Sequence, residues 1–266
     1  MNAVSRTKRS SWQITKAVIF ALMLREFQTR FGSRRMGAFW VLFEPMIHIA
    51  FMMFMFTVIR LRTVPGMDFP VWLLTGIVPF FLMRNIALRF MDTVSANRAL
   101  FAYPNIKIFD TFVARLLVEL MIYSAVYAIL VFILGFWFGY DVSVAYPLRW
   151  IASLAIGILF AFSLGMFFCV IVQVMPNSAT FIRLLFMPLY FISGVIFPIW
   201  SLPQQFLPWL LWNPFLHIID NIRTSVFLMH PETPGISYSY PISVTIIMLF
   251  LALGLYRVRK DYLLSR

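Results

Sequence analysis

Charged side chains are scarce in this sequence of 266 residues, where they occupy 12% of the positions. Soluble globular domains carry about 25% charged and about 45–50% apolar residues, whereas 62% of this chain is hydrophobic. Thirty Phe, sixteen Met and eight Trp contribute to that excess. The composition excludes an ordinary soluble fold. It predicts an all-α integral membrane protein in which residues 1–266 form one transmembrane domain.

Residues for disulfide formation, metal binding and catalysis are also few. The single cysteine, Cys169, excludes an internal disulfide. The three histidines, His48, His217 and His230, are far apart in the sequence, and no metal-ligand spacing occurs. No Gly-Lys pair occurs, so the chain lacks the phosphate-binding loop G-x-x-x-x-G-K-[ST], and it also lacks G-x-S-x-G. We therefore expect that this chain is not an enzyme and that it holds no cofactor, metal or catalytic residue.

Six stretches are long and apolar enough to cross a bilayer, for which a helix needs roughly 20 mainly apolar residues. They cover residues 37–59, 69–91, 112–138, 150–174, 178–199 and 239–256. The fourth stretch carries small residues at i+4 spacing, which permit close approach of another helix: Ser153, Gly157, Ala161, Gly165 and Cys169. This row predicts helix packing, with a face that slides during transport as the alternative.

Residues 12–31 differ from these six stretches. Their apolar run, from Ala17 to Leu24, is too short to span, and Lys16, Arg25, Glu26 and Arg30 bracket it. This pattern predicts an amphipathic helix that lies in the membrane interface. A seventh spanning helix is the alternative.

Lys and Arg are distributed unequally between the two sides that six spans define. Eighteen of the 22 basic residues lie with both termini, and the other side has only Arg60, Arg62, Arg149 and Arg223. Cytoplasmic segments collect basic residues, so we expect a multi-pass protein with both termini in the cytoplasm. The net charge of +12 is then mainly an orientation signal, and no nucleic acid partner is expected.

The loops between the spans carry their own signals. The cytoplasmic loop 92–111 is long enough for a short helix that ends at Pro104. The outer connection, residues 200–238, contains five prolines yet keeps Trp209 and Trp212. We expect this outer connection to form short interfacial or re-entrant helices between the fifth and sixth spans, buried in protein.

Ionisable side chains inside spans are costly and therefore indicate functional positions. Trp40, Glu44 and His48 lie one turn apart on the first span, which Pro45 should bend. Glu44 and His48 either form a polar stripe along a substrate path or make a contact between helices.

Two further pairs lie near the predicted cytoplasmic interface. Arg115 and Glu119 are spaced i, i+4, which favours a local structural pair. Arg84 and Arg89 either extend to the headgroups or line an entrance for an anionic substrate.

Aromatic side chains near both interfaces are typical belt anchors. Aromatic faces also pack against sugar rings. A polysaccharide path lined by Tyr123, Tyr127, Trp40 or Trp212 is therefore a second interpretation.

Two stretches carry a pattern of a known family. Residues 24–48 contain Arg25-Glu26, Arg30-Phe31-Gly32 and Phe43-Glu44-Pro45. Residues 190–227 contain the following elements: Ser193-Gly194, Leu202-Pro203, Asn213-Pro214, His217, Asp220 and Arg223. Both stretches resemble the permease subunits of type-2 ABC exporters, specifically those that export capsular polysaccharide. Asp220 stands where glutamate is common in that family.

The resemblance implies an assembly in the bacterial inner membrane. A homodimer would bind two copies of a cytoplasmic ATPase, which hold ATP and Mg²⁺. A lipid-linked acidic polysaccharide would pass between the two permeases. A periplasmic adaptor and an outer-membrane channel would continue the route.

Within such an assembly, we expect three groups of residues to have separate roles. Contact with the ATPase would involve a coupling helix at 93–106, the interfacial helix and the 175–180 turn, with these residues: Arg25, Glu26, Ala96, Asn97, Arg98, Phe101, Tyr103, Pro176 and Asn177. The outer gate would comprise Trp209, Asn213, Pro214, His217, Asp220 and Arg223. The candidate substrate path comprises Trp40, Glu44, His48, Arg84, Arg89, Arg115, Glu119, Tyr123, Tyr127 and Trp212.

Three alternatives stay open at this point. An exporter of O-antigen or teichoic acid belongs to the same class. A non-conducting membrane assembly subunit is a second alternative. A membrane-embedded glycosyltransferase is disfavoured, because the sequence has no acidic cluster for a metal-bound nucleotide sugar.

Overall fold

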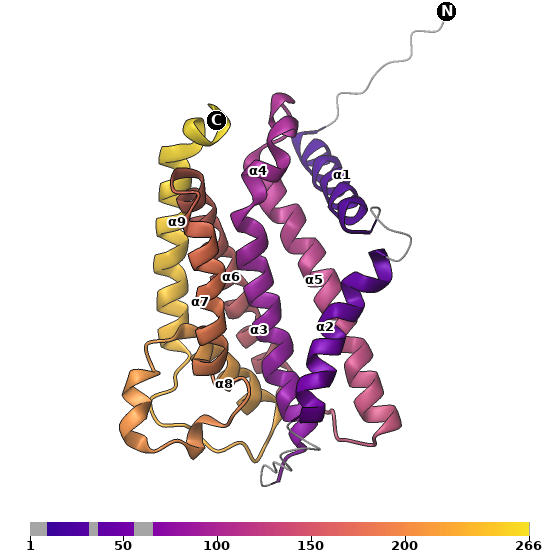
Figure 1. Ribbon diagram of the computed structural model, residues 1–266, viewed down its shortest axis with the longest axis vertical. Coiled ribbons are helices and arrows are strands. Elements are labelled where there is room, and N and C mark those ends of the chain that lie inside the picture. The colour runs from indigo at the N-terminus through magenta and orange to yellow at the C-terminus, as the bar shows by residue number, and fades with distance from the viewer. Residues whose placement is uncertain (1–9, 32–36, 56–65, 266) are drawn as a thin grey trace, which may run out of the picture.

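The computed structural model describes residues 10–31, 37–55 and 66–265, without the side chains of 31–42, 44, 45, 204 and 261–265. Its regular elements are helices (Figure 1). The long ones are α1 (Ser11–Phe31), α2 (Gly37–Phe54), α3 (Phe69–Met91), α5 (Ile108–Phe132), α6 (Pro147–Val174), α7 (Ser178–Ile192), α8 (Pro214–Val226) and α9 (Ser239–Ser265). A π-helical turn, Ile133–Trp137, extends α5. The predicted all-α class is thus confirmed.

Four helices of the described part are long and apolar enough to cross a membrane. They are Phe69–Met91, Ile108–Trp137, Pro147–Val174 and Ser239–Lys260. They correspond to the second, third, fourth and sixth predicted stretches. The count of six spans stays a prediction, because α2 has 18 residues and α7 only 15.

The fifth predicted stretch ends earlier than expected. The sequence predicted a span over 178–199, but α7 ends at Ile192. Gly194 follows with φ of +67°, a left-handed conformation that commonly ends helices and that glycine adopts without strain. The first predicted stretch, 37–59, is helical to Phe54, and its residues 56–59 lie outside the described part.

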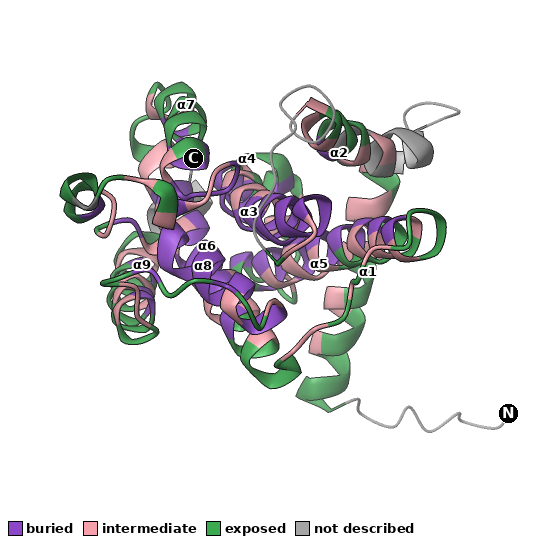
Figure 2. Ribbon diagram, turned by 90° about the horizontal axis from the view of Figure 1, so that it is seen from below, coloured by how far each residue is buried: buried purple, intermediate pink, exposed green. Residues whose placement is uncertain are grey.

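The core of the molecule is α3, against which α6 and α8 pack. Figure 2 shows α3 and α8 largely buried, whereas α1, α2, α7 and α9 present exposed faces. α6 buries one face, which includes Gly157, Ala161 and Gly165. A β-carbon on Gly157 would approach Met83 of α3 to 2.7 Å, and one on Gly165 would approach Phe90 to 2.8 Å. The row of small residues is therefore a packing face against α3, as predicted.

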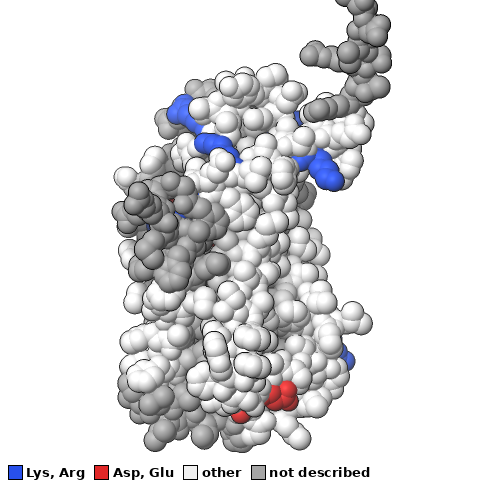
Figure 3. Space-filling model, turned by 90° about the vertical axis from the view of Figure 1, so that its right-hand side faces the viewer, with Lys and Arg blue, Asp and Glu red and all other residues white. Residues whose placement is uncertain are grey.

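The connections between the helices lie at two opposite ends of the molecule. The beginning of α1, the end of α9, the α3–α5 connection and the α6–α7 turn share the upper end in Figure 1. We call this the basic end, because most of the Lys and Arg on the face in Figure 3 gather there, while Asp and Glu appear at the opposite end. That opposite end carries α8, and we call it the α8 end. The two ends match the predicted division of charge.

Short helices occupy both predicted connections. Between α3 and α5 lie α4 (Thr93–Asn97) and a 3-10 helix, Arg98–Ala102. The predicted helix at 93–106 is thus present but ends before Tyr103. Two 3-10 helices, Ile199–Ser201 and Gln204–Trp209, precede α8. The helix predicted at 12–31 is present as α1, and its place in the membrane interface stays a prediction.

Candidate functional site

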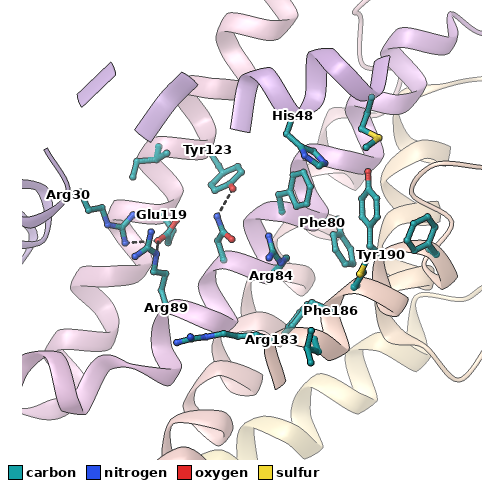
Figure 4. Close-up of a pocket in the computed structure, with 17 residues that line it drawn as sticks. Arg30, His48, Phe80, Arg84, Arg89, Glu119, Tyr123, Arg183, Phe186 and Tyr190 are labelled. Carbon is teal, nitrogen blue, oxygen red and sulfur yellow. Dashed lines mark hydrogen bonds and ion pairs between the residues drawn. The ribbon is translucent and has the colours of Figure 1, made fainter. Parts of the chain in front are cut away.

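A cleft of about 740 Å³ lies between α2 and α7, with α3 and α5 behind it (Figure 4). Figure 2 shows α2 and α7 on the same side of α3 and apart from each other. Polar residues of the lining are Arg30, His48, Arg84, Asn85, Arg89, Glu119, Tyr123, Arg183 and Tyr190. Apolar residues of the lining include Phe80, Phe81, Phe186, Met187 and Phe191. The cleft thus combines arginines with aromatic rings.

The aromatic rings link the two walls of the cleft. His48 of α2 meets Phe81 of α3 edge-on, with ring centroids 5.0 Å apart. Phe81 stacks on Tyr190 of α7 at 5.6 Å with an interplanar angle of 6°. Because α3 runs toward the basic end, Phe81 lies about one turn nearer the α8 end than Arg84. The aromatic contacts therefore span the cleft on its α8 side.

An ion-pair network lies on the basic side of the cleft and joins α1 to α5. Arg30 of α1 lies 2.6 Å from Glu119 of α5 and 3.1 Å from Glu26. Arg115 of α5 lies 3.3 Å from Glu26, and Arg89 of α3 lies 3.7 Å from Glu119. Burial alone would lower the pKa of Arg30, but Glu119 and Glu26 outweigh it and raise that pKa. Arg115 and Glu119 thus bind α1 rather than each other, contrary to the expected local pair.

The same end carries the residues predicted to contact an ATPase. Arg25 of α1 donates to the Asn97 side chain at 2.6 Å and to the Ala96 carbonyl at 3.4 Å. α1 is therefore tied to α4 as well as to α5. Arg183 of α7 reaches Asp92 at 2.9 Å.

These predicted contact residues differ in exposure. Asn97 is buried and Phe101 is half-buried. The remaining ones beyond α1 are exposed: Ala96, Arg98, Tyr103, Pro176 and Asn177. The exposed side chains form a surface at the basic end, and their contact with an ATPase stays a prediction.

At the α8 end, Arg223 binds the backbone just beyond the end of α7. Its guanidinium is buried, donates to the carbonyls of Gly194 and Val195, and lies 3.5 Å above the Trp72 ring. A buried cation needs such partners because its desolvation is costly. Arg223 therefore joins α3, α7 and α8.

The other predicted gate residues of α8 are also part of the packing. Asn213 accepts from the backbone N–H of Phe215 at 3.1 Å and donates to Ser193 at 2.8 Å. His217 contacts the Leu211 carbonyl through Nε2 at 2.8 Å and accepts from Ser237 through Nδ1 at 3.2 Å. These bonds fix the start of α8, where Pro214 is half-buried.

Asp220 completes this buried polar group, 3.7 Å from His230. Burial raises the pKa of Asp220 to about 7, against the opposing effect of Arg223, and burial lowers the pKa of His230 to about 4. His230 is therefore neutral at pH 7. Trp209 is the exception among the predicted gate residues, because it is 77% exposed.

The cleft gathers half of the predicted substrate path. His48, Arg84, Arg89, Glu119 and Tyr123 belong to its lining. Three predicted residues lie elsewhere. Arg115 is buried in the ion-pair network, Tyr127 packs on Trp150 at 5.8 Å, and Trp212 is at the α8 end. The side chains of Trp40 and Glu44 lie outside the described part.

Several cleft residues were not predicted. Arg183 interrupts an apolar stretch, which is a signal that the sequence contains. Phe81, Asn85 and Tyr190 give no such signal, since aromatic and polar residues occur throughout the chain. The bond from Asn85 to the Tyr123 hydroxyl, at 2.6 Å, becomes visible only in the fold.

Comparison with known proteins identifies the class. A family model described as ABC-2 type transporter matches residues 17–227, and the chain belongs to this family. The chain is 36% identical to the polysialic acid transport protein KpsM of Escherichia coli over 258 residues, 97% of this chain and 99% of that protein. It is 30% identical to the capsule polysaccharide export inner-membrane protein BexB of Haemophilus influenzae, over 83% of each chain. A similar match, 29% identical over 80% of each chain, is the capsule polysaccharide export inner-membrane protein CtrC of Neisseria meningitidis.

Proposed function

We propose that this chain is the permease subunit of an ATP-driven exporter that moves a lipid-linked acidic capsular polysaccharide across the bacterial inner membrane. The observation that carries the proposal is the cleft between α2 and α7, which combines arginines with aromatic rings. Arginine binds carboxylates, and aromatic faces can pack against sugar rings. Relatives named for capsule export favour this substrate over O-antigen or teichoic acid. The cleft favours a conduit over a non-conducting assembly subunit.

The proposed assembly is a homodimer with six spans in each copy. The first and fifth spans would be α2 and α7, and both termini would lie in the cytoplasm with the basic end. α7 presents Phe181, Leu184 and Met187 as exposed apolar side chains beside the cleft. A second copy facing α2 and α7 would enclose the path between the two clefts. A periplasmic adaptor and an outer-membrane channel would receive the polysaccharide.

Energy would come from two copies of a cytoplasmic ATPase that hold ATP and Mg²⁺. The chain has no phosphate-binding loop of its own. The ATPase would press on the α3–α5 connection, at the exposed side chains of Ala96, Arg98 and Tyr103. The bond between Arg25 and Asn97 would transmit this displacement to α1. The network of Arg30 with Glu119 would carry it on to the cleft.

Cross-linking to the ATPase tests this proposal. The permease and its ATPase are purified together, with Cys169→Ser and Tyr103→Cys in the permease and a photoactivatable cross-linker attached to the new cysteine. We expect a cross-link to the ATPase and ATP hydrolysis that rises when lipid-linked polysaccharide is added. A cysteine at Leu228, exposed at the α8 end, is the matched control and should give no cross-link. A verified complex without the Tyr103 cross-link, or with hydrolysis indifferent to polysaccharide, would contradict the proposal.

A further inference from the structure

We propose that Arg84 binds a carboxylate of an acidic sugar in the cleft, whereas the neighbouring arginines hold helices together. The inference rests on the proposed function and assigns different tasks to Arg84 and Arg89, which the sequence treats alike.

The ion pairs separate Arg84 from the other arginines of the cleft. Arg89 lies 3.7 Å from Glu119, and Arg183 lies 2.9 Å from Asp92. Arg30 is held by two carboxylates. Among the side chains that the structure describes, no Asp or Glu forms an ion pair with Arg84. Its charged end instead lies 5.8 Å from the centre of the Phe81 ring.

The cleft and its ion-pair network also carry an excess of positive charge. Five arginines, at 30, 84, 89, 115 and 183, face three carboxylates, at Glu26, Asp92 and Glu119. The side chain of Glu44, one turn before His48, lies outside the described part. Its single charge would reduce this excess without removing it. An anion entering the cleft therefore meets a positive potential, which a low-dielectric surrounding strengthens.

The position of Arg84 is costly unless its side chain faces water or a ligand. It lies seven residues before the end of α3, or about 10 Å along a helix that is long enough to span the membrane. A charge at such depth is tolerated where it faces a water-filled cavity and commonly marks a substrate path. The planar guanidinium can hold a carboxylate through two parallel hydrogen bonds.

An aromatic ring beside Arg84 fits the rest of an acidic sugar. Phe81 stacks on the buried ring of Tyr190 one turn nearer the α8 end, and Phe81 itself is only half-buried. A sugar ring can lay its apolar face on Phe81 while its carboxylate reaches Arg84. A lipid phosphate would satisfy the same guanidinium but would not use the aromatic ring in this way.

Charge-selective labelling tests the inference without requiring transport. The complex with the ATPase is placed in nanodiscs of neutral lipid, with Cys169→Ser and Met187→Cys in the permease. Met187 is a cleft residue that is 68% exposed. Two methanethiosulfonate reagents of similar size, one anionic and one cationic, modify this cysteine. A cysteine at Met229, exposed at the α8 end, gives the reference ratio of the two rates.

We expect the anionic reagent to be favoured at Met187 relative to Met229. Arg84→Gln should reduce this preference by roughly tenfold, the effect of one unit charge nearby. Arg149→Gln, at the opposite end, should leave it unchanged. An unchanged preference in Arg84→Gln would overturn the inference. Failure of the anionic reagent to modify both Met187→Cys and Leu184→Cys would also overturn it. A large rise of the preference in Glu44→Gln would also overturn it, because Glu44 would then neutralise Arg84.

Protection by ligands distinguishes the source of the anion. A trimer of sialic acid should slow modification at Met187, and this protection should disappear in Arg84→Gln and with the carboxyl-reduced trimer. Protection by short-chain phosphatidic acid alone would overturn the assignment to a sugar carboxylate. Selective labelling without ATP-driven export would contradict the proposed function and leave the anion site standing. If Arg84→Gln loses the preference for the anionic reagent but still exports polysaccharide normally, the result would contradict the role of Arg84 as an anion site and leave the proposed function standing.

Discussion

Arg223 illustrates at the residue scale how one buried cation organises the α8 end. Its two terminal nitrogens satisfy the carbonyls of Gly194 and Val195 just beyond α7, and buried carbonyls need such partners. Its planar face rests on Trp72 of α3. Space for this arrangement requires glycine at position 76, since a β-carbon there would lie 2.3 Å from the guanidinium.

Gly76→Ala is therefore expected to destabilise the protein. Overpacking of a filled site costs about 1–3 kcal/mol, because Arg223 or the end of α7 must shift. Gly254→Ala in α9 is the matched control, since nothing lies within 4 Å of that β-carbon. The measurement is the midpoint of thermal unfolding of the purified permease in detergent. An equal midpoint for both variants would show that Arg223 is not held as described.

The sequence identified the polar residues of the α8 end but not what they do. Asn213, His217 and Arg223 were predicted as gate residues from a family pattern. The fold shows that they bond to backbone and side-chain groups of α7 and of the segments that flank α8. Those partners could not be predicted, because backbone carbonyls carry no sequence signal and lie up to 29 residues away.

At the scale of elements, the chief feature is the attachment of α1 to α5 by buried ion pairs. The side chains of Arg30 and Glu119 are almost fully buried, with 7% and 2% exposed. The pairing of Asp92 with Arg183, in contrast, is about half exposed. Both pairs join different helices near the basic end, so they form a natural comparison.

Glu119→Gln should be far more damaging than Asp92→Asn. Removing one partner of a buried pair leaves an uncompensated charge and costs about 3–5 kcal/mol, whereas an exposed pair contributes about 0–1 kcal/mol. We expect Glu119→Gln to lower the thermal midpoint strongly and to reduce the amount of ATPase that copurifies. The Asp92→Asn variant should have the thermal midpoint and the amount of copurified ATPase of the parent protein. Similar losses in the two variants would refute the claim that the buried network anchors α1.

Helix existence was predictable from composition, whereas helix ends and pairings were not. Long apolar runs predicted α3, α5, α6 and α9, because spanning a bilayer requires such runs. The end of α7 depended on the left-handed backbone at Gly194 and was placed seven residues too late. Arg115 and Glu119 have the spacing of a local pair, yet α1 offers each of them a partner from a distant part of the sequence.

At the scale of the whole molecule, charge and topology agree. The basic end joins the beginning of α1, the end of α9 and the connections that were predicted to be cytoplasmic (Figure 1). The cleft begins on this side with arginines and continues toward the α8 end with aromatic rings. Such an order suits a polymer that carries negative charge and enters from the cytoplasm.

The proposed function requires this chain to conduct an acidic polysaccharide when a partner ATPase hydrolyses ATP. The most direct test uses proteoliposomes that contain the permease with its ATPase and a fluorescent lipid-linked acidic polysaccharide in the outer leaflet, on the ATPase side. ATP should move the polysaccharide into the lumen, where an added glycan-degrading enzyme no longer reaches it. Arg84→Gln should slow this movement severalfold, and Arg149→Gln should not. An assembled complex that hydrolyses ATP while all of the polysaccharide stays accessible would contradict the claim.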